Sequence, residues 1–539
     1  MDAINAIFPL RYSTFVLSIV GFVWSAFYFV ATGQWGLVVC IFAFLIVVGL
    51  HDLQQKSHAI LRNYPILGHM RFLLEFIRPE IRQYFIESDA EAAPFSRAQR
   101  SLVYARAKGA SDSRPFGTQL DVRAAGYEWI NHSVAPTVID SHDFRVRVGG
   151  ADCAQPYDIS LFNISAMSFG ALSANAIMSL NLGAKMGGFA HDTGEGSISR
   201  HHRTHGGDLI WELGSGYFGC RTDDGRFSEE KFVINALNPQ VKMIEIKLSQ
   251  GAKPGHGGVL PGPKVTAEIA EARGVPMGQD CVSPASHSSF STPLEMMAFI
   301  RKLRELSGGK PVGFKLCVGH PWEWFAIVKA MQESGTTPDF IVVDGAEGGT
   351  GAAPLEFSDH MGMPMLEGLR LVHNTLVGVN LRDRIRLGAS GKIISGFDVA
   401  RTLALGADWC NSARGFMFAL GCIQAQTCHT GNCPTGVTTQ DPQRQIALVV
   451  PSKAERVKNF HQHTLESLQE LMQSAGLHSP SELDLHHIER RLSEFETRPL
   501  SEMMPAIQPG ALLQASPDWP DVFKRYWSHA SAATFQHVA

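Results

Sequence analysis

Three cysteines stand close together in the string GCIQAQTCHTGNCPTG, where Cys422, Cys428 and Cys433 are separated by five and four residues. Clustered thiolates with a glycine between them and a proline after them suit a loop that wraps around an iron–sulfur cluster. Three ligands with no fourth cysteine nearby favour a three-iron cluster over a four-iron cubane. A zinc ion with His429 as a fourth ligand is the main alternative, although the spacing is not that of a familiar zinc finger. Three inert buried thiols are the other alternative.

Five glycine-rich stretches follow predicted strands or helices. They cover residues 165–170, 193–196, 251–262, 344–354 and 388–396. Backbone amides in such loops can approach a phosphate closely, because glycine has no Cβ atom. In a barrel the loops after the last strands commonly hold a phosphate, and we expect the stretches Gly348–Gly351 and Gly388–Gly391 there. The alternative is that these glycines only permit tight turns.

Two lysines and one glutamate stand out from the patterns around them. Lys247 in EIKLS and Lys315 in GFKLC lie at similar positions of two apolar strand patterns. Because burying a charge without a partner is costly, we expect both at a barrel mouth in a functional role rather than as outward-facing charges. A lysine beside a flavin would stabilise the negative charge of the reduced ring. Glu195, which is flanked by glycines, could transfer protons, an exposed loop acid being the alternative.

The elements that must position these residues alternate between short apolar runs and helical patterns. Strands are predicted at residues 159–166, 243–248, 312–318, 340–343, 385–387 and 409–411. Helices fit between them at 263–272, 294–306, 322–332 and 396–405. This alternation indicates a parallel sheet. Six visible strands, with two more expected, favour a closed eight-stranded TIM barrel over an open doubly wound sheet, and no GxGxxG follows the first strand.

The N-terminal region carries no Asp, Glu, Lys or Arg between residues 12 and 50. That run is about twice the roughly 20 residues that a helix needs to cross a bilayer, so we predict two spans, near 13–30 and 35–50. Basic residues on both sides, such as Arg11 and Lys56, place both ends and the rest of the chain in the cytoplasm. A cleaved signal peptide and a buried or re-entrant hairpin are the competing interpretations.

The composition is that of a folded protein. The chain has 539 residues, 45% hydrophobic and 18% charged, which argues against general disorder. With 47 basic and 51 acidic residues its net charge is -4, which offers no electrostatic footprint for nucleic acid. An odd number of cysteines, nine, in a chain expected to face the cytoplasm argues against a disulfide framework. We predict four parts: a transmembrane hairpin (1–50), a juxtamembrane helical connector (51–152), the barrel (153–445) and a helical C-terminal extension (446–539).

Taken together, five strings resemble the synthase part of glutamate synthases over about residues 158–445. They are MSFGALS, GEG, IKLSQGAKPGHGGVLPG, DGAEGGTGAAP and GCIQAQTCHTGNCPTGV. The resemblance implies a TIM barrel with FMN at its mouth and a three-iron four-sulfur cluster held by Cys422, Cys428 and Cys433. It implies FMN contacts at Ala166, Met167, Ser168, Lys247, Lys315, Gly348, Gly349, Thr350 and Gly391. Gln250 and Lys253 match positions that face 2-oxoglutarate, and Glu195 matches an acidic residue beside the flavin.

The sequence also departs from that family. Glutamate synthase large subunits begin with a glutaminase domain whose first mature residue is a nucleophilic cysteine, whereas here Asp2 follows Met1 and the apolar run stands in that place. The family's GEGG is GEGS at Gly194–Ser197, and its DGG is GAS at Gly388–Ser390. We also expect too short a C-terminal region for the family's glycine-rich β-helix. The chain therefore resembles the standalone, membrane-associated glutamate-synthase-like proteins.

The expected function is that of an oxidoreductase acting on CH–NH2 donors, which reductively aminates 2-oxoglutarate to glutamate by hydride transfer from FMN to an imine. Ammonia would come from solution or a separate glutaminase, and electrons from a donor such as ferredoxin or a reductase subunit. The alternative is a membrane flavoprotein that exchanges electrons with quinone or acts on another amino compound. A scaffold that has lost its cofactors is a third possibility. The membrane is an expected partner, and nucleic acid is not.

Overall fold

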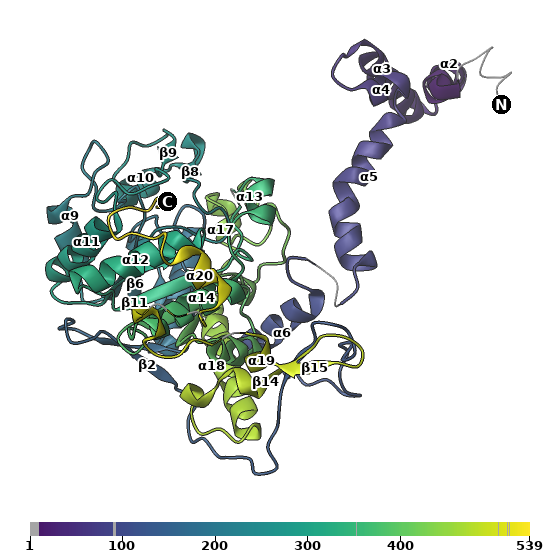
Figure 1. Ribbon diagram of the computed structural model, residues 1–539. Coiled ribbons are helices and arrows are strands. Elements are labelled where there is room, and N and C mark those ends of the chain that lie inside the picture. The colour runs from purple at the N-terminus through teal and green to yellow at the C-terminus, as the bar shows by residue number, and fades with distance from the viewer. Residues whose placement is uncertain are drawn as a thin grey trace. The chain divides into compact units, whose positions relative to one another are not determined.

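The computed structural model describes residues 10–89, 93–351, 353–504, 506–514, 516 and 518–538. Two compact units divide between Arg97 and Ala98 (Figure 1). The smaller contains the apolar N-terminal run and the helices after it, and the larger contains every strand that the structure describes.

The N-terminal unit begins with two long apolar helices, α2 (Ser13–Thr32) and α3 (Gly36–Gln54). The chain turns between them at Gly33, whose φ of 70° is in the left-handed region that glycine adopts readily. Both helices are long and apolar enough to cross a membrane, and most of their large side chains are exposed in the isolated chain. The two predicted helices are thus present, and the second continues four residues past its predicted end at Leu50.

Shorter helices complete this unit: α4 (Ala59–Asn63), α5 (Gly68–Ile81) and the π-helical turn η2 (Arg82–Ile86). Asp52, at the end of α3, is fully buried. Its carboxylate accepts a hydrogen bond from the backbone N–H of Ile66 and lies 2.9 Å from Nε2 of His69. These contacts fasten α5 to the end of the second apolar helix, and α5 then extends away from the helix pair (Figure 1).

The larger unit is built on a closed barrel of eight parallel strands. The strands are β4 (Phe162–Ile164), β5 (His191–Asp192), β6 (Leu209–Leu213), β7 (Val241–Lys247), β10 (Val312–Leu316), β11 (Phe340–Asp344), β12 (Arg386–Ser390) and β13 (Trp409–Ser412). The last strand pairs with the first, because Asn411 of β13 is in register with Asn163 of β4. The prediction of a closed barrel is confirmed.

Two barrel strands, β5 and β6, were not located from the sequence. β5 has only two residues, both polar, and the apolar pattern of β6 is broken by Glu212. The predicted strand 159–166 is in fact two elements. Its first part belongs to β3 (Tyr157–Ser160), which pairs antiparallel with β2 (Arg145–Val148) outside the barrel, and only β4 enters the barrel.

Helices surround the barrel and cover its apolar outer face. The longer ones are α7 (Ala174–Gly187), α9 (Glu229–Ala236), α11 (Pro293–Leu306), α12 (Pro321–Ser334), α14 (Met365–Gly378), α15 (Gly396–Ala404) and α16 (Arg414–Leu420). Several begin at side-chain caps, as at Thr292, whose Oγ1 accepts the backbone N–H of Glu295 while that glutamate caps Thr292 in return. The indole of Trp211 on β6 stacks on Phe232 of α9, with ring centroids 5.3 Å apart. Alternate residues of β6, among them Glu212, therefore face the barrel interior.

The C-terminal region is mainly helical, as predicted, and also forms strands. The long helix α18 (Val450–Ser474) packs on α7 so closely that a Cβ atom at Gly183 would lie 2.5 Å from Val457. Strands β14 (Ile488–Arg491) and β15 (Thr497–Pro499) form a small sheet with β1 (Glu128–Ile130), so this region pairs with the predicted connector. Near the end, α20 (Asp521–Tyr526) packs on α12 through stacked Phe523 and Phe325.

Candidate functional site at the barrel mouth

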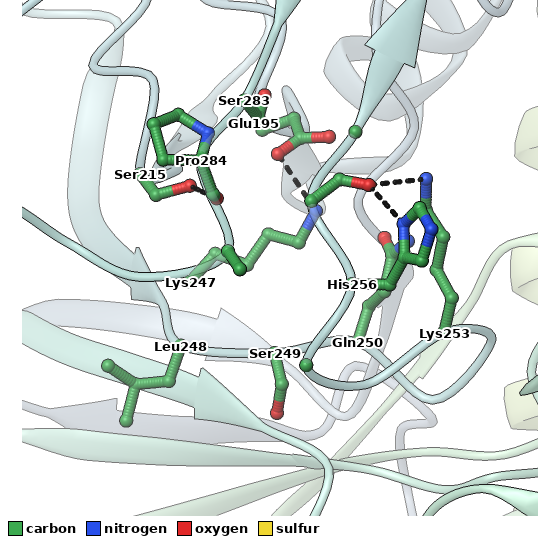
Figure 2. A pocket seen from close by; sticks show the side chains of 14 residues that line it. Glu195, Ser215, Lys247, Leu248, Ser249, Gln250, Lys253, His256, Ser283 and Pro284 are labelled. Carbon is green, nitrogen blue, oxygen red and sulfur yellow. Dashed lines mark hydrogen bonds and ion pairs between the residues drawn. The ribbon is translucent and has the colours of Figure 1, made fainter.

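The loops that follow the barrel strands enclose a pocket at the carboxyl ends of the strands (Figure 2). Glu195 reaches it from the loop after β5, Lys247 from the end of β7, and Gln250 and Lys253 from the loop after β7. The fold therefore brings Glu195 together with three predicted site residues of one later stretch, Lys247, Gln250 and Lys253. The remaining lining residues are Ser215, Leu248, Ser249, Gly255, His256, Gly257, Gly258, Ser283, Pro284 and Ala285.

Glu195 and Lys247 form an ion pair inside this pocket. The Nζ of Lys247 lies 3.0 Å from Oε2 of Glu195, and the side chains are 11% and 20% exposed respectively. Burial pushes the pKa of Glu195 upward, but the charge and hydrogen bond of Lys247, together with the charges of Arg273 and Lys253, outweigh burial and the pKa falls below its ordinary value. Glycine is needed around the pair, since a Cβ atom at Gly214 would lie 2.9 Å from the Glu195 side chain. Glu195 is thus a carboxylate that can accept a proton.

Lys253 and His256 close another side of the pocket. The Nζ of Lys253 donates to the carbonyl oxygen of Gly257 at 3.3 Å, and Nδ1 of His256 donates to the same oxygen at 2.6 Å. Lys253 is almost fully buried, and burial lowers the pKa of its amine below the ordinary value. Among the described residues this ammonium has one hydrogen-bond acceptor, so it has donors free for an anionic ligand. Gln250 adds a neutral amide to the same lining.

A buried histidine that no sequence motif marked supports Lys247. His287 donates from Nε2 to the backbone carbonyl of Lys247 at 2.8 Å, while its Nδ1 lies 3.0 Å from the hydroxyl of Tyr217. Burial lowers the pKa of His287 to about 4, so the ring is neutral and its two nitrogens have distinct roles. His287, like Ser215 and Ser283 of the lining, lies between glycine-rich stretches rather than in one, which is why no motif marked it.

The loop after β4, predicted to contact FMN through Ala166, Met167 and Ser168, is locked against the loop that carries Glu195. The backbone N–H of Gly196 donates to Oγ of Ser168 at 3.2 Å. At Gly194, where φ is 65°, a Cβ atom would lie 2.7 Å from the backbone nitrogen of Ser168. The glycines of the GEGS string therefore allow two strand-end loops to touch, which fixes Glu195 at the mouth.

Lys315 does not line the pocket, although it is in register with Lys247 on the neighbouring strand. Its Nζ turns into the barrel interior, where it contacts Glu212 and lies 3.6 Å from Glu245. The predicted contact of Lys315 with FMN remains a prediction, and the structure adds carboxylate partners that the sequence pattern did not suggest.

The two stretches expected to bind phosphate have different positions in the barrel. Gly348, Gly349 and Thr350 follow β11, the sixth strand, and not one of the last two strands. Gly388–Ser390 lie inside β12. Gly388 leaves room there for Trp409, whose ring would be 2.6 Å from a Cβ atom at this position. Of this stretch only Gly391 and the residues after it form the loop beyond the seventh strand.

Arg414, which no sequence motif marked, connects these loops to the end of the eighth strand. It begins α16 directly after β13, and its Nη2 donates to the carbonyl oxygen of Gly349 at 3.3 Å. Gly349 has open space where a Cβ atom would be. An open glycine loop beside a guanidinium is a donor set that suits a phosphate group. Inside the barrel, the buried Oδ1 of Asn411 has no hydrogen-bond partner among the described residues, which leaves an acceptor for a ligand.

The three cysteines of the GCIQAQTCHTGNCPTG string line one pocket. Cys422 and Cys433 are buried and Cys428 is partly exposed. A backbone N–H donates to Sγ of Cys422 at 3.5 Å, and Nη1 of Arg414 lies 4.0 Å from Sγ of Cys428. Burial opposes ionisation of Cys433, but hydrogen bonds, the first from Thr435, lower the pKa of its thiol to about 7. Burial raises the pKa of Cys422 above its ordinary value.

The donor atoms of the cysteine pocket are thiol sulfurs. Among the described residues, the one group of three or more His, Cys, Asp or Glu whose ligand atoms all lie within 4.8 Å of one another does not contain the cysteines. Three sulfur ligands that line one pocket are a donor set that fits an iron–sulfur cluster, and a zinc ion is the alternative.

The cysteine pocket adjoins other parts of the larger unit. A Cβ atom at Gly351, the last residue of the predicted phosphate stretch, would lie 3.1 Å from the Cβ of Cys428. On another side, the hydroxyl of Tyr104 in α6 (Arg97–Lys108) donates to the backbone carbonyl of Cys422 at 2.6 Å. The cysteine loop therefore contacts both the barrel mouth and the helix that leads into the barrel.

The comparisons with known proteins agree with these features. Residues 140–478 match the family model described as the conserved region in glutamate synthase. The glutamate synthase large subunit-like protein YerD of Bacillus subtilis is 39% identical over 480 residues, which are 81% of this chain and 91% of that protein. The archaeal glutamate synthase [NADPH] of Methanocaldococcus jannaschii is 37% identical over 317 residues, 59% of each chain.

Among solved structures, the flavin-binding domain of baker's yeast flavocytochrome b2 aligns with a TM-score of 0.40 and 12% identity, over 84% of this chain and 92% of that one. The family match covers the barrel, the pocket and the cysteine loop in one continuous region. With this match and the similarity to YerD, the chain belongs to the glutamate synthase family, through its conserved synthase region.

Proposed function

We propose that the protein is an iron–sulfur flavoprotein that reduces an imine, formed from 2-oxoglutarate and ammonia, to glutamate. The observation that carries this proposal is the pocket in which an ionised Glu195, paired with Lys247, faces the buried ammonium of Lys253. A 2-oxo dicarboxylate needs a cation for its carboxylates, and imine formation needs a group that moves protons. The pocket has both, and it lies where the active sites of barrel enzymes lie.

FMN and a three-iron four-sulfur cluster are the cofactors that these residues fit. Gly348–Thr350, Gly391 and Arg414 would hold the FMN phosphate, and the backbone at Ala166–Ser168 with Lys247 would border its ring. Cys422, Cys428 and Cys433 would hold the cluster, because they line one pocket and offer three soft sulfur ligands. When bound, FMN supplies a hydride for the imine carbon and the cluster supplies it with electrons.

The side chains of the pocket have separate tasks in this reaction. Lys253 and Gln250 bind a carboxylate of 2-oxoglutarate and orient its carbonyl carbon toward the barrel. Glu195 accepts a proton from the attacking amine, because the pKa of its carboxyl is held below the ordinary value. Lys247 keeps Glu195 ionised and adds a positive charge at the place where the reduced ring would be negative. His287 keeps the end of β7 in position by its hydrogen bond to Lys247.

The N-terminal helices would anchor the enzyme in a membrane. The exposed apolar side chains of α2 and α3 support this proposal, as does their length. Arg11 before them and Lys56 after them would keep the barrel on the cytoplasmic side. Ferredoxin or a reductase subunit would donate electrons, and ammonia would come from solution or from a separate glutaminase.

The test begins with the absorption spectrum, iron content and FMN content of the purified full-length protein. The reduced protein is then mixed with 2-oxoglutarate plus ammonium, with 2-oxoglutarate plus glutamine, and with each component alone, and flavin reoxidation is followed without oxygen. We expect acceleration only when 2-oxoglutarate and a nitrogen source are both present. Lys253→Met should remove it, while the surface variant Lys242→Met should not. No acceleration under any combination would refute the glutamate assignment.

A second function shares the cofactors and is favoured by the exposed apolar helices, which would bring the flavoprotein to the membrane where quinones reside. In that case the protein would exchange electrons with quinone, or would act on another amino compound. The distinguishing measurement is flavin turnover in membranes that contain this protein, with and without added quinone. Quinone-dependent turnover without any response to 2-oxoglutarate would establish this second function.

A further inference from the structure

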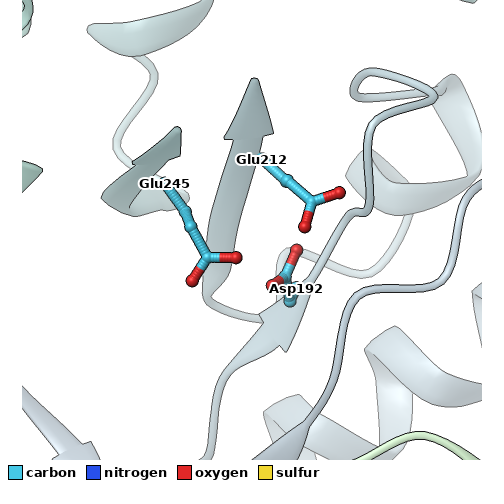
Figure 3. A group of neighbouring side chains, drawn as sticks. All are labelled: Asp192, Glu212 and Glu245. Atoms are coloured by element: carbon cyan, nitrogen blue, oxygen red, sulfur yellow. The ribbon is translucent and has the colours of Figure 1, made fainter. Parts of the chain in front are cut away.

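Four ionisable side chains meet inside the barrel, directly below the pocket. Asp192 on β5, Glu212 on β6 and Glu245 on β7 have carboxylate oxygens within 4.8 Å of one another. Figure 3 shows how the three side chains converge. Lys315 on β10 points its Nζ at Glu212 and Glu245. All four are excluded from water, since even Lys315, the most exposed, is only 4% exposed. We call these four residues the interior cluster.

The interior cluster forms the layer of side chains next to the pocket. Asp192 precedes Glu195 by three residues, and Glu245 precedes Lys247 by two, so the same strands carry a cluster residue and then a pocket residue. At about 3.3 Å per residue along a strand, the two layers are roughly 7–10 Å apart. A charge that appears in the pocket therefore acts on the interior cluster over a short distance.

The charges of the interior cluster do not balance if every group is ionised. Three carboxylates and one ammonium would leave two negative charges buried, which is strongly unfavourable. Among the described residues, neither buried carboxylate oxygen of Glu245 has a hydrogen-bond partner, since the ammonium of Lys315 stays 3.6 Å from Oε1. The side chain points at Asp192 (Figure 3). An ionised carboxylate would be poorly satisfied in such a place, whereas a protonated one can donate to its neighbour.

We propose that the interior cluster binds protons: Glu245 carries a resident proton, and Asp192 takes up one more from solvent when negative charge is added in the pocket. The second part rests on the proposed flavin function. Two electrons and one proton added to a bound flavin ring leave one negative charge there. The Asp192 carboxylate then becomes a carboxylic acid, and no group in the interior cluster is oxidised or reduced.

The pKa values of the cluster residues agree with the roles proposed for Asp192 and Glu245. Burial, followed by the charge of Glu212, raises the pKa of Asp192 to about 7, so its carboxyl changes state near neutral pH. Burial and the charge of Asp192 raise the pKa of Glu245 well above its ordinary value. For Lys315, burial opposes the charge, but Glu212 and Glu245 raise its pKa, so the ammonium persists. Asp344 at the end of β11 is the other acid that faces Lys315.

A metal ion is the other occupant that three carboxylates suggest, and Lys315 argues against it. Its ammonium already contacts Glu212 and approaches Glu245, so a cation would have to displace a charge of the same sign. A proton needs no displacement. For a negative charge roughly 8 Å away at an effective dielectric constant of about 20, we expect an increase of roughly thirtyfold in the proton affinity of Asp192.

The first experiment counts protons taken up when the full-length protein is reduced in weak buffer near pH 7.5. The wild-type protein should take up more than the one proton per two electrons that the ring requires, and Asp192→Asn should take up about one. The matched control is Asp208→Asn, a half-exposed carboxylate just before β6, which should behave as wild type. Equal uptake by the wild type and Asp192→Asn would overturn the proposal for Asp192.

The second experiment uses infrared difference spectra, which need no variant for Asp192. Reduction should produce the carbonyl band of a protonated carboxyl group, and the band should shift when aspartate is labelled with carbon-13 at its side-chain carboxyl. A separate carboxyl band present before reduction should disappear in Glu245→Gln. If the band that appears on reduction does not shift with the label, the proposal for Asp192 is overturned. If the band present before reduction is unchanged in Glu245→Gln, the proposal for Glu245 is overturned. If the protein binds no flavin, the proposed proton uptake by Asp192 is overturned. Failure to make glutamate would change neither the proton count nor the infrared bands.

Discussion

Removal of Lys247 should change the pH dependence of the proposed reaction in a predictable direction. Two unit charges 3.0 Å apart attract each other by roughly 5–6 kcal/mol at an effective dielectric constant of about 20. Both side chains are partly exposed, and Arg273 and Lys253 also stabilise the ionised Glu195. We therefore expect Lys247 alone to contribute about 2 kcal/mol to the stability of the ionised carboxylate. Without Lys247, burial has the larger effect on the pKa of Glu195, so Lys247→Met should increase the proton affinity of Glu195 about thirtyfold.

The assay is flavin reoxidation by 2-oxoglutarate at a fixed concentration of free ammonia, measured against pH and normalised to bound FMN. In the wild-type protein the carboxylate of Glu195 persists to low pH, because the pKa is below its ordinary value. The acid limb of the Lys247→Met profile should therefore lie at higher pH. Lys242→Met, which breaks an ion pair of 3.6 Å at the surface end of the same strand, is the control. If the acid limb of the pH profile stays in place in Lys247→Met, or moves equally in both variants, the role of Glu195 is refuted.

Three other predictions test separate parts of the site and fold. Lys253→Met should raise the KM for 2-oxoglutarate about ten- to hundredfold in steady-state kinetics, since a charge-assisted hydrogen bond contributes roughly 1.5–3 kcal/mol; an unchanged KM would contradict its role. Cys428→Ser should lower bound iron and the electron paramagnetic resonance signal, whereas Cys410→Ser, a buried thiol on β13, should not. Burial lowers the pKa of His461 to about 3 in the folded chain, so its contribution to stability is complete above pH 6.5 and is lost as the pH falls toward 3. The thermal midpoint of His461→Phe should therefore fall less than that of wild type between pH 6.5 and 4, and an equal fall would contradict the neutral ring.

Sequence reasoning reached the barrel because six strands are apolar runs, and apolar runs between helices are typical of buried parallel strands. It missed β5 and β6, because a two-residue strand has no periodicity and Glu212 interrupts the other. The strand pairing explains such a residue, since β6, β7 and β10 are neighbours and bring Glu212, Glu245 and Lys315 together. The antiparallel pairing of β3 with β2 depends on tertiary contacts and likewise has no local signal.

The site residues selected by type, such as Glu195 and Lys253, do meet in one pocket, because each follows a strand and strand ends converge in a barrel. Their pairing was not predictable: Lys247 and Lys315 occupy equivalent positions, yet one pairs with a pocket acid and the other with interior acids. Arg414 had no motif around it. Tyr104 contacts Cys422 from a helix that is separated from it by 318 positions, a relation that no sequence window can show.

The most direct test of the central claim is product analysis after a single turnover. The purified protein is reduced, freed of excess reductant, and mixed with 2-oxoglutarate and nitrogen-15 ammonium without oxygen, and the products are identified by mass spectrometry. The account predicts labelled glutamate in an amount close to that of the reduced flavin, and much less from Lys253→Met. Oxidation of the flavin with no labelled glutamate, or 2-oxoglutarate recovered unchanged beside a reduced flavin, would contradict it.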